Sequence, residues 1–233
     1  MIGHLMYVLH YAPDNASLIL RLALEEARLP YRCELVDRRT RAQDSPAYRA
    51  LNPTGLIPTL ITPDGPISET GAALLYLSEQ SDAGLAPPPG APARTAFLRW
   101  LFFLSNTLHA DMRQLFYPEY YVPPGAKAEH HQIISARLTG HFRLIDTVAA
   151  NDPALFGPPS ALALYTLALI RWPALYPKGG TGWFTLTDFP ALHRLALIAE
   201  ARPAIHAAQQ AEGLGPTPFS APQYASPPEG NST

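Results

Sequence analysis

The sequence predicts two structural units: a mixed α/β unit with the element order β-α-β-α-β-β-α, and an all-helical unit after it. Three observations lead to this prediction. Up to residue 81, short apolar runs of strand length alternate with apolar residues at helical spacing. A run rich in proline and glycine then interrupts the chain between residues 84 and 92. Beyond it the apolar pattern is helical, so we expect one mixed sheet followed by a helical bundle.

Composition narrows the class of protein. The chain has 233 residues, of which 47% are hydrophobic and 15% charged, enough to bury the core of one large or two small domains. A formal net charge of −2 argues against nucleic acid as a partner, because a nucleic-acid binder needs a basic face. The most apolar segment, residues 96–104, is too short to span a bilayer, so we expect no membrane partner.

Cysteine and histidine usage predicts no metal cofactor. Cys33 is the single cysteine, which excludes an internal disulfide and a cysteine-based metal cluster. The adjacent His130 and His131 fall on different faces of a helix and are poor metal ligands. The amino terminus lacks the basic and apolar regions of a signal peptide, which predicts a cytoplasmic protein.

The first unit contains seven expected elements. Apolar residues recur every three or four positions from Ala16 onward, and Leu29-Pro30 ends this helix. Ser45 and Pro46 are typical of a helix start, as cap and first-turn residue. The elements, in chain order, are a strand over residues 6–9, a helix over 16–27, a strand over 31–36, a helix over 45–51, strands near 59–61 and at 67, and a helix over 69–80.

Two neighbouring turns in this unit predict a binding site. Ile57-Pro58 precedes an apolar strand, where proline has no N–H to give to a sheet. We expect this bond to be cis, which would expose the backbone N–H and C=O of Ile57. Glu69 and Thr70 open a helix, beside its free N–H groups. Together they can hold a small zwitterion, with its ammonium on Glu69 and its carboxylate on Thr70 and the helix N–H groups.

The second unit is expected to contain four or five helices. Their ranges are 94–117, 126–150, 160–172 and 188–212, the last with Pro203 as a break. The helix over 160–172 is apolar on nearly every side, which places it at the centre of a bundle. A tail rich in Pro, Gly and Ser is expected either to lie across the body or to be disordered. The resulting division is residues 1–81, a linker over 82–92, a helical domain over 93–212 and the tail over 213–233.

Several motifs follow one another in a specific order along the chain. In the first unit they are Asn52-Pro-Thr-Gly-Leu-Ile-Pro58 and Glu69-Thr70. In the second they are Arg99-Trp100-Leu101, Leu108-His109, Leu115-Phe116, Tyr165 followed by Ile170-Arg171-Trp172, and Arg202-Pro203. In this order they resemble the cytosolic glutathione S-transferase superfamily of bacterial type, closest to its beta and nu classes. The resemblance implies a thioredoxin-like first domain, glutathione as co-substrate, and a homodimer with a role in detoxification.

The resemblance also assigns the parts of glutathione to positions of this chain. Ile57-Pro58 would hold the cysteinyl group, and Glu69-Thr70 the γ-glutamyl end. Thr54 stands where the family often has Lys or Arg for the glycyl carboxylate. The residues expected to take over that task are Arg39, Arg41 and Gln43.

The sequence leaves open which residue activates the glutathione thiol. The thiol must become a thiolate to attack, and the start of the first helix favours an anion. The cysteine of the beta class falls on Ala16, which rules out a mixed disulfide through that position. The candidate donors, in order of preference, are Asn15, Ser17 and Tyr11. Asn15 and Ser17 are equally typical of helix caps that have no catalytic role.

An electrophile pocket is expected between the two domains, lined by His109, Tyr117 and Trp172. His109 aligns with an active-site histidine of the beta class, whereas a lone histidine in an apolar helix is as often a packed core residue. The leading hypothesis is transfer of the glutathione thiolate to a small apolar electrophile. The alternatives are a glutathione-dependent disulfide or peroxide reductase, and a non-catalytic binding protein with the same fold.

Overall fold

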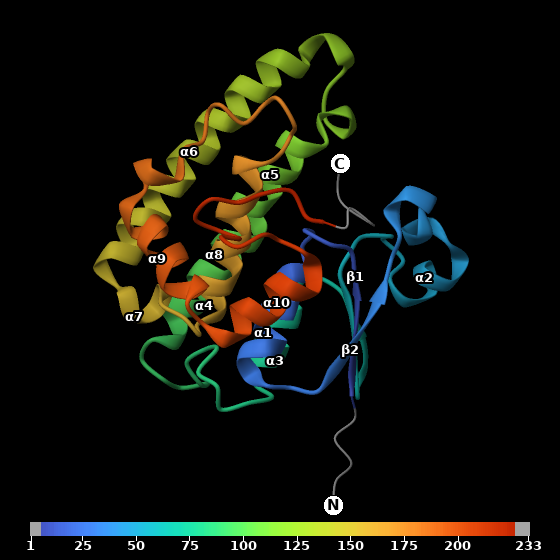
Figure 1. Cartoon of the computed structure of the whole chain (residues 1–233), viewed down its shortest axis with the longest axis vertical. Coiled ribbons are helices and arrows are strands. Elements are labelled where there is room, and N and C mark those ends of the chain that lie inside the picture. Colours follow the sequence, from blue (N-terminus) through green and yellow to red (C-terminus); the bar gives the residue numbers. More distant parts are fainter. Residues whose placement is uncertain (1–5, 227–233) are drawn as a thin grey trace, which may run out of the picture.

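Residues 6–226, which the computed structural model describes, form a four-stranded sheet with its own helices and, beside it, a helical bundle (Figure 1). The strands are β1 (Tyr7–Tyr11), β2 (Tyr31–Leu35), β3 (Thr59–Thr62) and β4 (Gly65–Ile67), in the spatial order β2-β1-β3-β4. β1 pairs parallel with β2 and antiparallel with β3, and β3 pairs antiparallel with β4. The sheet is therefore mixed, and the predicted order β-α-β-α-β-β-α is confirmed.

Three helices complete the first domain. α1 (Ser17–Ala27) and α3 (Thr70–Ser78) lie between the sheet and the helical bundle, and α2 (Pro46–Leu51) lies on the other side of the sheet (Figure 1). α2 begins as predicted, because the hydroxyl of Ser45 accepts a hydrogen bond from the N–H of Tyr48 at 3.2 Å. The sheet is thus covered on both faces, as in a thioredoxin-like domain.

The second domain is all-helical, as predicted. Its helices are α4 (Arg94–Phe103), α5 (His109–Phe116), α6 (Lys127–Asn151), α7 (Pro153–Phe156), α8 (Ala161–Arg171), α9 (Pro190–Glu200) and α10 (Pro203–Glu212). Where the sequence predicts one helix over 94–117, a π-helical stretch at Leu104–Leu108 separates α4 from α5. In residues 6–226, no helix is both long and apolar enough to cross a membrane.

The core centres on α8 and α1. Every residue of α8 is buried, which confirms its predicted place at the centre of the bundle. The hydroxyl of Ser160 caps it by accepting a hydrogen bond from the N–H of Leu162 at 3.3 Å. α1 buries all its residues from Ser17 to Leu24, because it contacts α3, α8 and α10. The two domains therefore share one continuous core, which holds the loop before α1 in a defined place.

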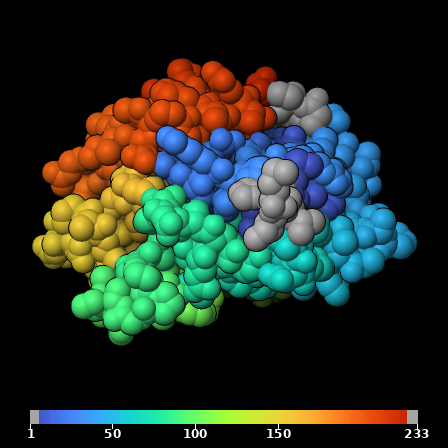
Figure 2. Space-filling view, turned by 90° about the horizontal axis from the view of Figure 1, so that it is seen from below, coloured from blue at the N-terminus to red at the C-terminus, as the bar shows by residue number. Residues whose placement is uncertain are grey.

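Of the two alternatives expected for the tail, residues 213–226 adopt the first, in which it lies across the body of the protein. They have no regular structure and lie across the helical domain, with Phe219 buried. The Glu200 carboxylate accepts hydrogen bonds from the N–H groups of Phe219 and Ser220, both at 2.8 Å. C-terminal residues, orange and red in Figure 2, lie directly against the blue first domain. The rest of the predicted tail, residues 227–233, lies outside the described residues.

Candidate functional site

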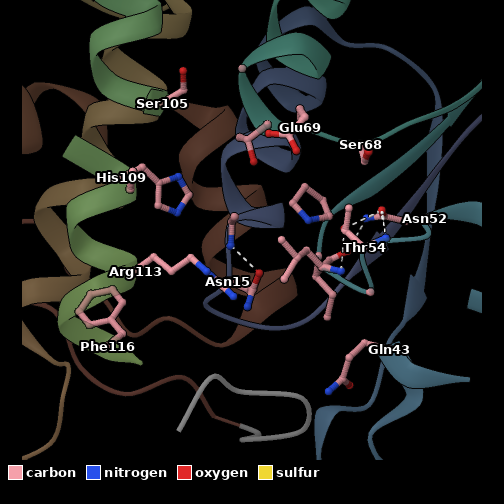
Figure 3. A pocket seen from close by; sticks show the side chains of 18 of the residues that line it. Asn15, Gln43, Asn52, Thr54, Ser68, Glu69, Ser105, His109, Arg113 and Phe116 are labelled. Carbon is pink, nitrogen blue, oxygen red and sulfur yellow. Dashed lines mark hydrogen bonds between the residues drawn. The ribbon is translucent and has the colours of Figure 1, made fainter. Parts of the chain in front are cut away.

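A cavity of about 970 Å³ opens between the two domains. Side chains of α5 lie on one side of it and those of the first domain on the other (Figure 3). The predicted site residues that line it are Asn15, Arg41, Gln43, Ile57, Pro58, Glu69, Thr70, His109, Tyr117 and Trp172. Two predicted thiol donors, Ser17 and Tyr11, are not part of its lining.

The turn at Pro58 forms part of the first-domain wall. The peptide bond between Ile57 and Pro58 is cis, as predicted. The Leu56 carbonyl before it accepts hydrogen bonds from Asn52 Nδ2 at 2.8 Å and from the Tyr48 hydroxyl at 2.7 Å. These two bonds fix the backbone where it borders the cavity, so a peptide ligand meets a preformed edge.

Glu69 provides a carboxylate at the cavity. It lines the cavity in front of α3, and its side chain has no hydrogen bond or ion pair with any other described residue (Figure 3). Its backbone φ of 66° lies in the left-handed region, which residues other than glycine rarely adopt. Strained backbone of this kind clusters at ligand sites. Because the carboxylate is otherwise unpaired within residues 6–226, an ammonium group is the natural ligand for it.

The three residues predicted to hold a glycyl carboxylate differ in whether they line the cavity and in whether they already have a partner. Arg39 is absent from the cavity lining, and its guanidinium pairs with Asp37 at 3.4 Å. Arg41 lines the cavity but pairs with Asp44 at 2.8 Å. Gln43 also lines it, and its buried Oε1 has no hydrogen-bond partner among the described residues. Oε1 is an acceptor, so it can pair with an N–H of a ligand, whereas a carboxylate would have to accept from the Nε2 of Gln43.

Of the three predicted thiol donors, the structure brings Asn15 alone to the cavity. Its Oδ1 accepts a hydrogen bond from the following backbone N–H at 2.7 Å, which leaves Nδ2 as the group able to donate. Ser17 is fully buried, and its hydroxyl donates to the Ala12 carbonyl at 3.0 Å. The ring of Tyr11 packs under the Arg21 guanidinium at 4.8 Å. Ser17 and Tyr11 therefore support the turn rather than face a ligand.

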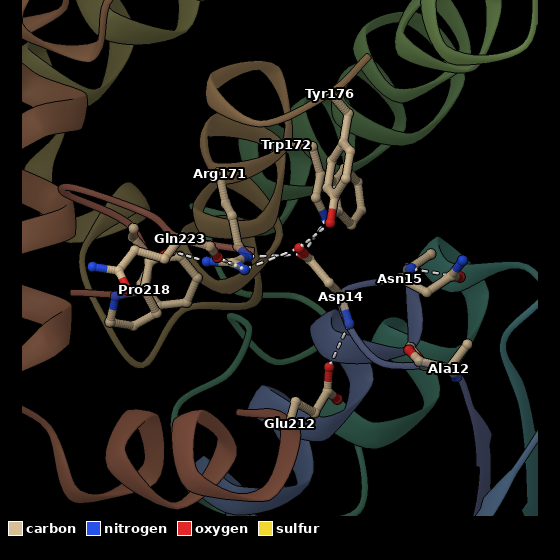
Figure 4. A network of polar contacts seen from close by, with 12 residues as sticks. Ala12, Asp14, Asn15, Arg171, Trp172, Tyr176, Glu212, Pro218 and Gln223 are labelled. Atoms are coloured by element: carbon tan, nitrogen blue, oxygen red, sulfur yellow. Dashed lines mark hydrogen bonds and ion pairs between the residues drawn. The ribbon is translucent and has the colours of Figure 1, made fainter. Parts of the chain in front are cut away.

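A buried ionic network stabilises the turn that carries Asn15, and it begins at the neighbouring residue Asp14 (Figure 4). Asp14, next to Asn15, accepts hydrogen bonds on its carboxylate from Arg171 Nε at 2.7 Å and Nη2 at 2.9 Å. Trp172 Nε1 and the Tyr176 hydroxyl donate to the same carboxylate at 3.1 and 2.8 Å. Asp14 and Arg171 are both 0% exposed, so they form a buried salt bridge.

The network continues through the last helix of the bundle. The Glu212 carboxylate accepts hydrogen bonds from the Asp14 N–H at 2.9 Å and from Arg21 Nε at 2.8 Å. Burial raises the pKa of Glu212, while the Arg21 guanidinium acts to lower it. The turn that carries Asn15 is therefore fixed on its backbone side by α10 and on its side-chain side by α8.

This network is not among the features predicted from the sequence. A signal for it was present, because Arg171 is the one charged residue in an otherwise apolar helix, and a buried arginine must be paired. The identity of the partner could not be found from the pattern, since Asp14 lies 157 positions away in the chain.

His109 lines the cavity as a neutral imidazole. Its Nδ1 lies 2.9 Å from the Tyr165 hydroxyl, and its ring packs against Trp172 with centroids 5.3 Å apart. Burial desolvates the imidazolium and Arg113 repels it, which together lower the pKa of His109 to about 4. At neutral pH His109 therefore offers a hydrogen-bonding ring to the cavity and no charge.

Replacing His109 with glutamine is expected to reduce the acid sensitivity of the fold. Between pH 6.5 and about 4 the unfolded chain binds a proton at His109 that the folded chain does not. His109 therefore does not lower the free energy of unfolding above pH 6.5. As pH falls towards 4 it lowers this free energy, by at most about 3 kcal/mol. Urea unfolding of both proteins at pH 7.0 and 4.5 measures this. If both lose the same stability on acidification, the pKa of His109 is not lowered in the folded protein.

Cys33 and the histidines provide no metal site in the described part of the chain. Within residues 6–226, no group of three His, Cys, Asp or Glu side chains is placed to hold a metal ion. Cys33 is half-buried in β2 and does not line the cavity, and burial raises the pKa of its thiol. It has the character of an inert packed thiol.

Known proteins share the sequence pattern and the fold. Residues 16–80 match the family described as Glutathione S-transferase, N-terminal domain. Glutathione S-transferase GstA of Escherichia coli O157:H7 is 25% identical over 210 residues, which are 88% of this chain and 98% of that protein. Disulfide-bond oxidoreductase YfcG of Escherichia coli strain K12 is 32% identical over 168 residues, which are 68% of this chain and 75% of that one.

A solved structure extends the similarity to three dimensions. The sphingomonad glutathione S-transferase complexed with glutathione is 28% identical and superposes with a TM-score of 0.74. The superposition covers 89% of this chain and all of that one. Both domains are therefore included in the match.

Proposed function

Because this chain belongs to the cytosolic glutathione S-transferase superfamily, of bacterial type, we propose that it binds glutathione between its domains and activates the thiol for transfer. One observation carries the proposal: the cis-proline turn, Glu69 and Asn15 border a single cavity. Glutathione has peptide groups, an ammonium and a thiol, and each finds a matching group there.

Each part of glutathione has an assigned partner in this proposal. The Ile57 backbone pairs with the cysteinyl peptide, and Glu69 binds the γ-glutamyl ammonium. Thr70 and the first N–H groups of α3 bind the γ-glutamyl carboxylate. The residues for the glycyl carboxylate are Gln43 and Arg41, both of which line the cavity.

Asn15 activates the thiol by donating a hydrogen bond from Nδ2 to the sulfur, without ionising itself. The start of α1 adds a positive partial charge that favours the thiolate. A thiol pKa lowered by about two units requires roughly 3 kcal/mol of anion stabilisation. One hydrogen bond to a charged acceptor and one helix end are together sufficient for this. The thiolate then attacks the electrophile and the leaving group departs with its bonding electron pair.

Glutathione binding is the first test, and Glu69→Gln the variant that localises it. Loss of one charge-assisted bond to the ammonium should weaken glutathione binding about 10- to 100-fold. Thermal stabilisation by glutathione, titrated on the full chain, measures the affinity. Glu129→Gln is the matched control, because Glu129 is exposed on α6 and is not part of the lining. A wild-type protein that glutathione neither stabilises nor retains on an affinity column would leave only a non-catalytic role for the fold.

A glutathione-dependent disulfide reductase is the second candidate. The relative named as a disulfide-bond oxidoreductase is 32% identical, and the single cysteine of this chain does not line the cavity. Glutathione would then supply both thiols. One thiolate attacks a disulfide sulfur and releases the other sulfur as a thiolate, and a second glutathione resolves the mixed disulfide. Turnover of hydroxyethyl disulfide, compared with turnover of an aryl halide, decides between the two activities.

A homodimer in the cytoplasm completes the proposal. By analogy with the superfamily, the first domain of one chain would contact the helical domain of its partner, through α3 and α4. Phe102 on α4 is 56% exposed, as expected for a side chain covered in such an interface. Light scattering on the purified protein measures the oligomeric state.

A further inference from the structure

We propose that the second substrate carries a carboxylate, which binds to Arg38 and Arg113 at the helical-domain side of the cavity. The inference rests on the proposed function, because it names the substrate class of the same site. It replaces the apolar electrophile expected from the sequence. The reason is that this part of the lining contains two guanidinium groups with no carboxylate partner in residues 6–226.

Arg38 comes from the turn after β2 and reaches across to the second domain. Its Nη2 donates a hydrogen bond to the Tyr117 hydroxyl at 3.1 Å. Its Nη1 is buried and has no hydrogen-bond partner among the described residues. A buried guanidinium N–H without an acceptor is costly, so an acceptor supplied by a ligand would be bound strongly.

Arg113 lies on α5, across the cavity from the first domain, and its side chain extends toward Asn15 (Figure 3). Its Cζ is 5.4 Å from the centre of the Tyr117 ring and 5.8 Å from that of Tyr120. Arg38 Cζ is 5.9 Å from the same Tyr117 ring. Both cations are therefore held against one aromatic ring, which orients them before any ligand arrives.

Each of the other charged residues of the lining has an ion pair or an assigned role in glutathione binding. Arg41 and Arg49 both pair with Asp44, each at 2.8 Å. Asp14 is paired with Arg171 in the core. Glu69 has the opposite charge and is assigned to the ammonium of glutathione. Arg38 and Arg113 are the guanidinium groups of the lining that have no ion pair within residues 6–226, and a planar carboxylate is the anion that guanidinium groups bind best.

Two kinds of second substrate bring such a carboxylate. One is an electrophile that itself carries an acid group, and the other is a disulfide that contains a second glutathionyl unit. The direction of the Arg113 side chain, toward Asn15, suits either, because it brings the carboxylate to the side of the cavity where the sulfur reacts (Figure 3). With an aryl chloride, the thiolate forms the C–S bond, the C–Cl bond breaks, and chloride leaves with the electron pair.

The test compares a chlorodinitrobenzoate with its neutral methyl ester as substrates of the full-length protein. Arg38→Met and Arg113→Met should each lower the ratio of kcat/KM for the acid to kcat/KM for the ester about tenfold, the worth of one charge-assisted hydrogen bond. Arg113→Lys should recover part of the ratio. Arg143→Met is the matched control and should leave the ratio unchanged, because Arg143 is exposed on α6 and outside the lining.

Inhibition by oxidised glutathione forms the second arm. If the carboxylate belongs to a second glutathionyl unit, the inhibition constant should rise about tenfold in the same two variants. A change in either arm supports the inference. It is overturned if neither arm changes, or if the variants alter only the KM for glutathione or the pKa of its bound thiol. Wild-type protein that fails to bind glutathione would instead refute the proposed function, so the two failures are distinguishable.

Discussion

Replacing Asp14 with asparagine is expected to lower the free energy of unfolding by about 3–5 kcal/mol, the largest effect on stability that we anticipate. The substitution keeps the size of the side chain and removes its charge. Arg171 is 0% exposed and would then be a buried cation without its anionic partner. Trp172 and Tyr176 would also lose a charged acceptor.

Urea unfolding at pH 7 measures this change, with Asp82→Asn as the matched control. Asp82 is exposed in the linker, so its substitution should change stability by less than about 0.5 kcal/mol. The double variant Asp14→Asn, Arg171→Met should be more stable than Asp14→Asn alone, because it removes the unpaired charge. If Asp14→Asn matches the control, or if the double variant is less stable than the single one, the ion pair does not hold the turn.

Asn15→Ala is expected to lower kcat/KM about 100-fold, the largest effect on activity that we anticipate. The alanine cannot donate to the sulfur, so the pKa of the bound thiol should rise towards that of free glutathione, with the start of α1 alone still favouring the thiolate. Thiolate absorbance in the ultraviolet, titrated against pH in the binary complex, reads that pKa directly. The turn itself should persist, because Asp14, Arg171 and Glu212 still hold it.

Ser17→Ala is the control for this experiment. Ser17 bonds only to the backbone of Ala12 within the described chain, so its loss should reduce stability and leave the thiol pKa unchanged. If Ser17→Ala shifts the thiol pKa and Asn15→Ala does not, the roles of the two residues are reversed. Because both positions lie at the start of α1, comparing the two variants distinguishes a residue that activates the thiol from one that only stabilises the turn.

Much of the fold could be predicted because its signals are local. Ser45 and Ser160 cap the helices that follow them, and Pro203 starts α10 as a first-turn residue. The cis bond before Pro58 follows from proline at a strand start. The π-helical stretch at Leu104–Leu108 could not be predicted, because it depends on packing around the helix rather than on local preference.

The candidate site also has features that could be predicted from the sequence and features that could not. The motif around Pro58 and the helix start at Glu69 were sufficient to predict two walls of the cavity. The sequence favoured Asn15 over Ser17 but did not exclude Ser17, because two polar residues on either side of the observed N-cap, Ala16, are distinguished by the direction of their side chains. That direction is determined by packing against α8 and α10, which lie far along the chain.

Local patterns along the chain specify which elements form and which chemical groups the protein carries. Capping, proline geometry and apolar spacing act over a few residues, so they can be predicted without knowledge of the rest of the chain. Which charges are paired depends instead on how the chain folds in three dimensions. Asp14 meets Arg171 across 157 positions, whereas Arg38 meets Tyr117 across 79 and no carboxylate within residues 6–226. Electrostatic partners are chosen by distance in space, and a chain brings them together only when it folds.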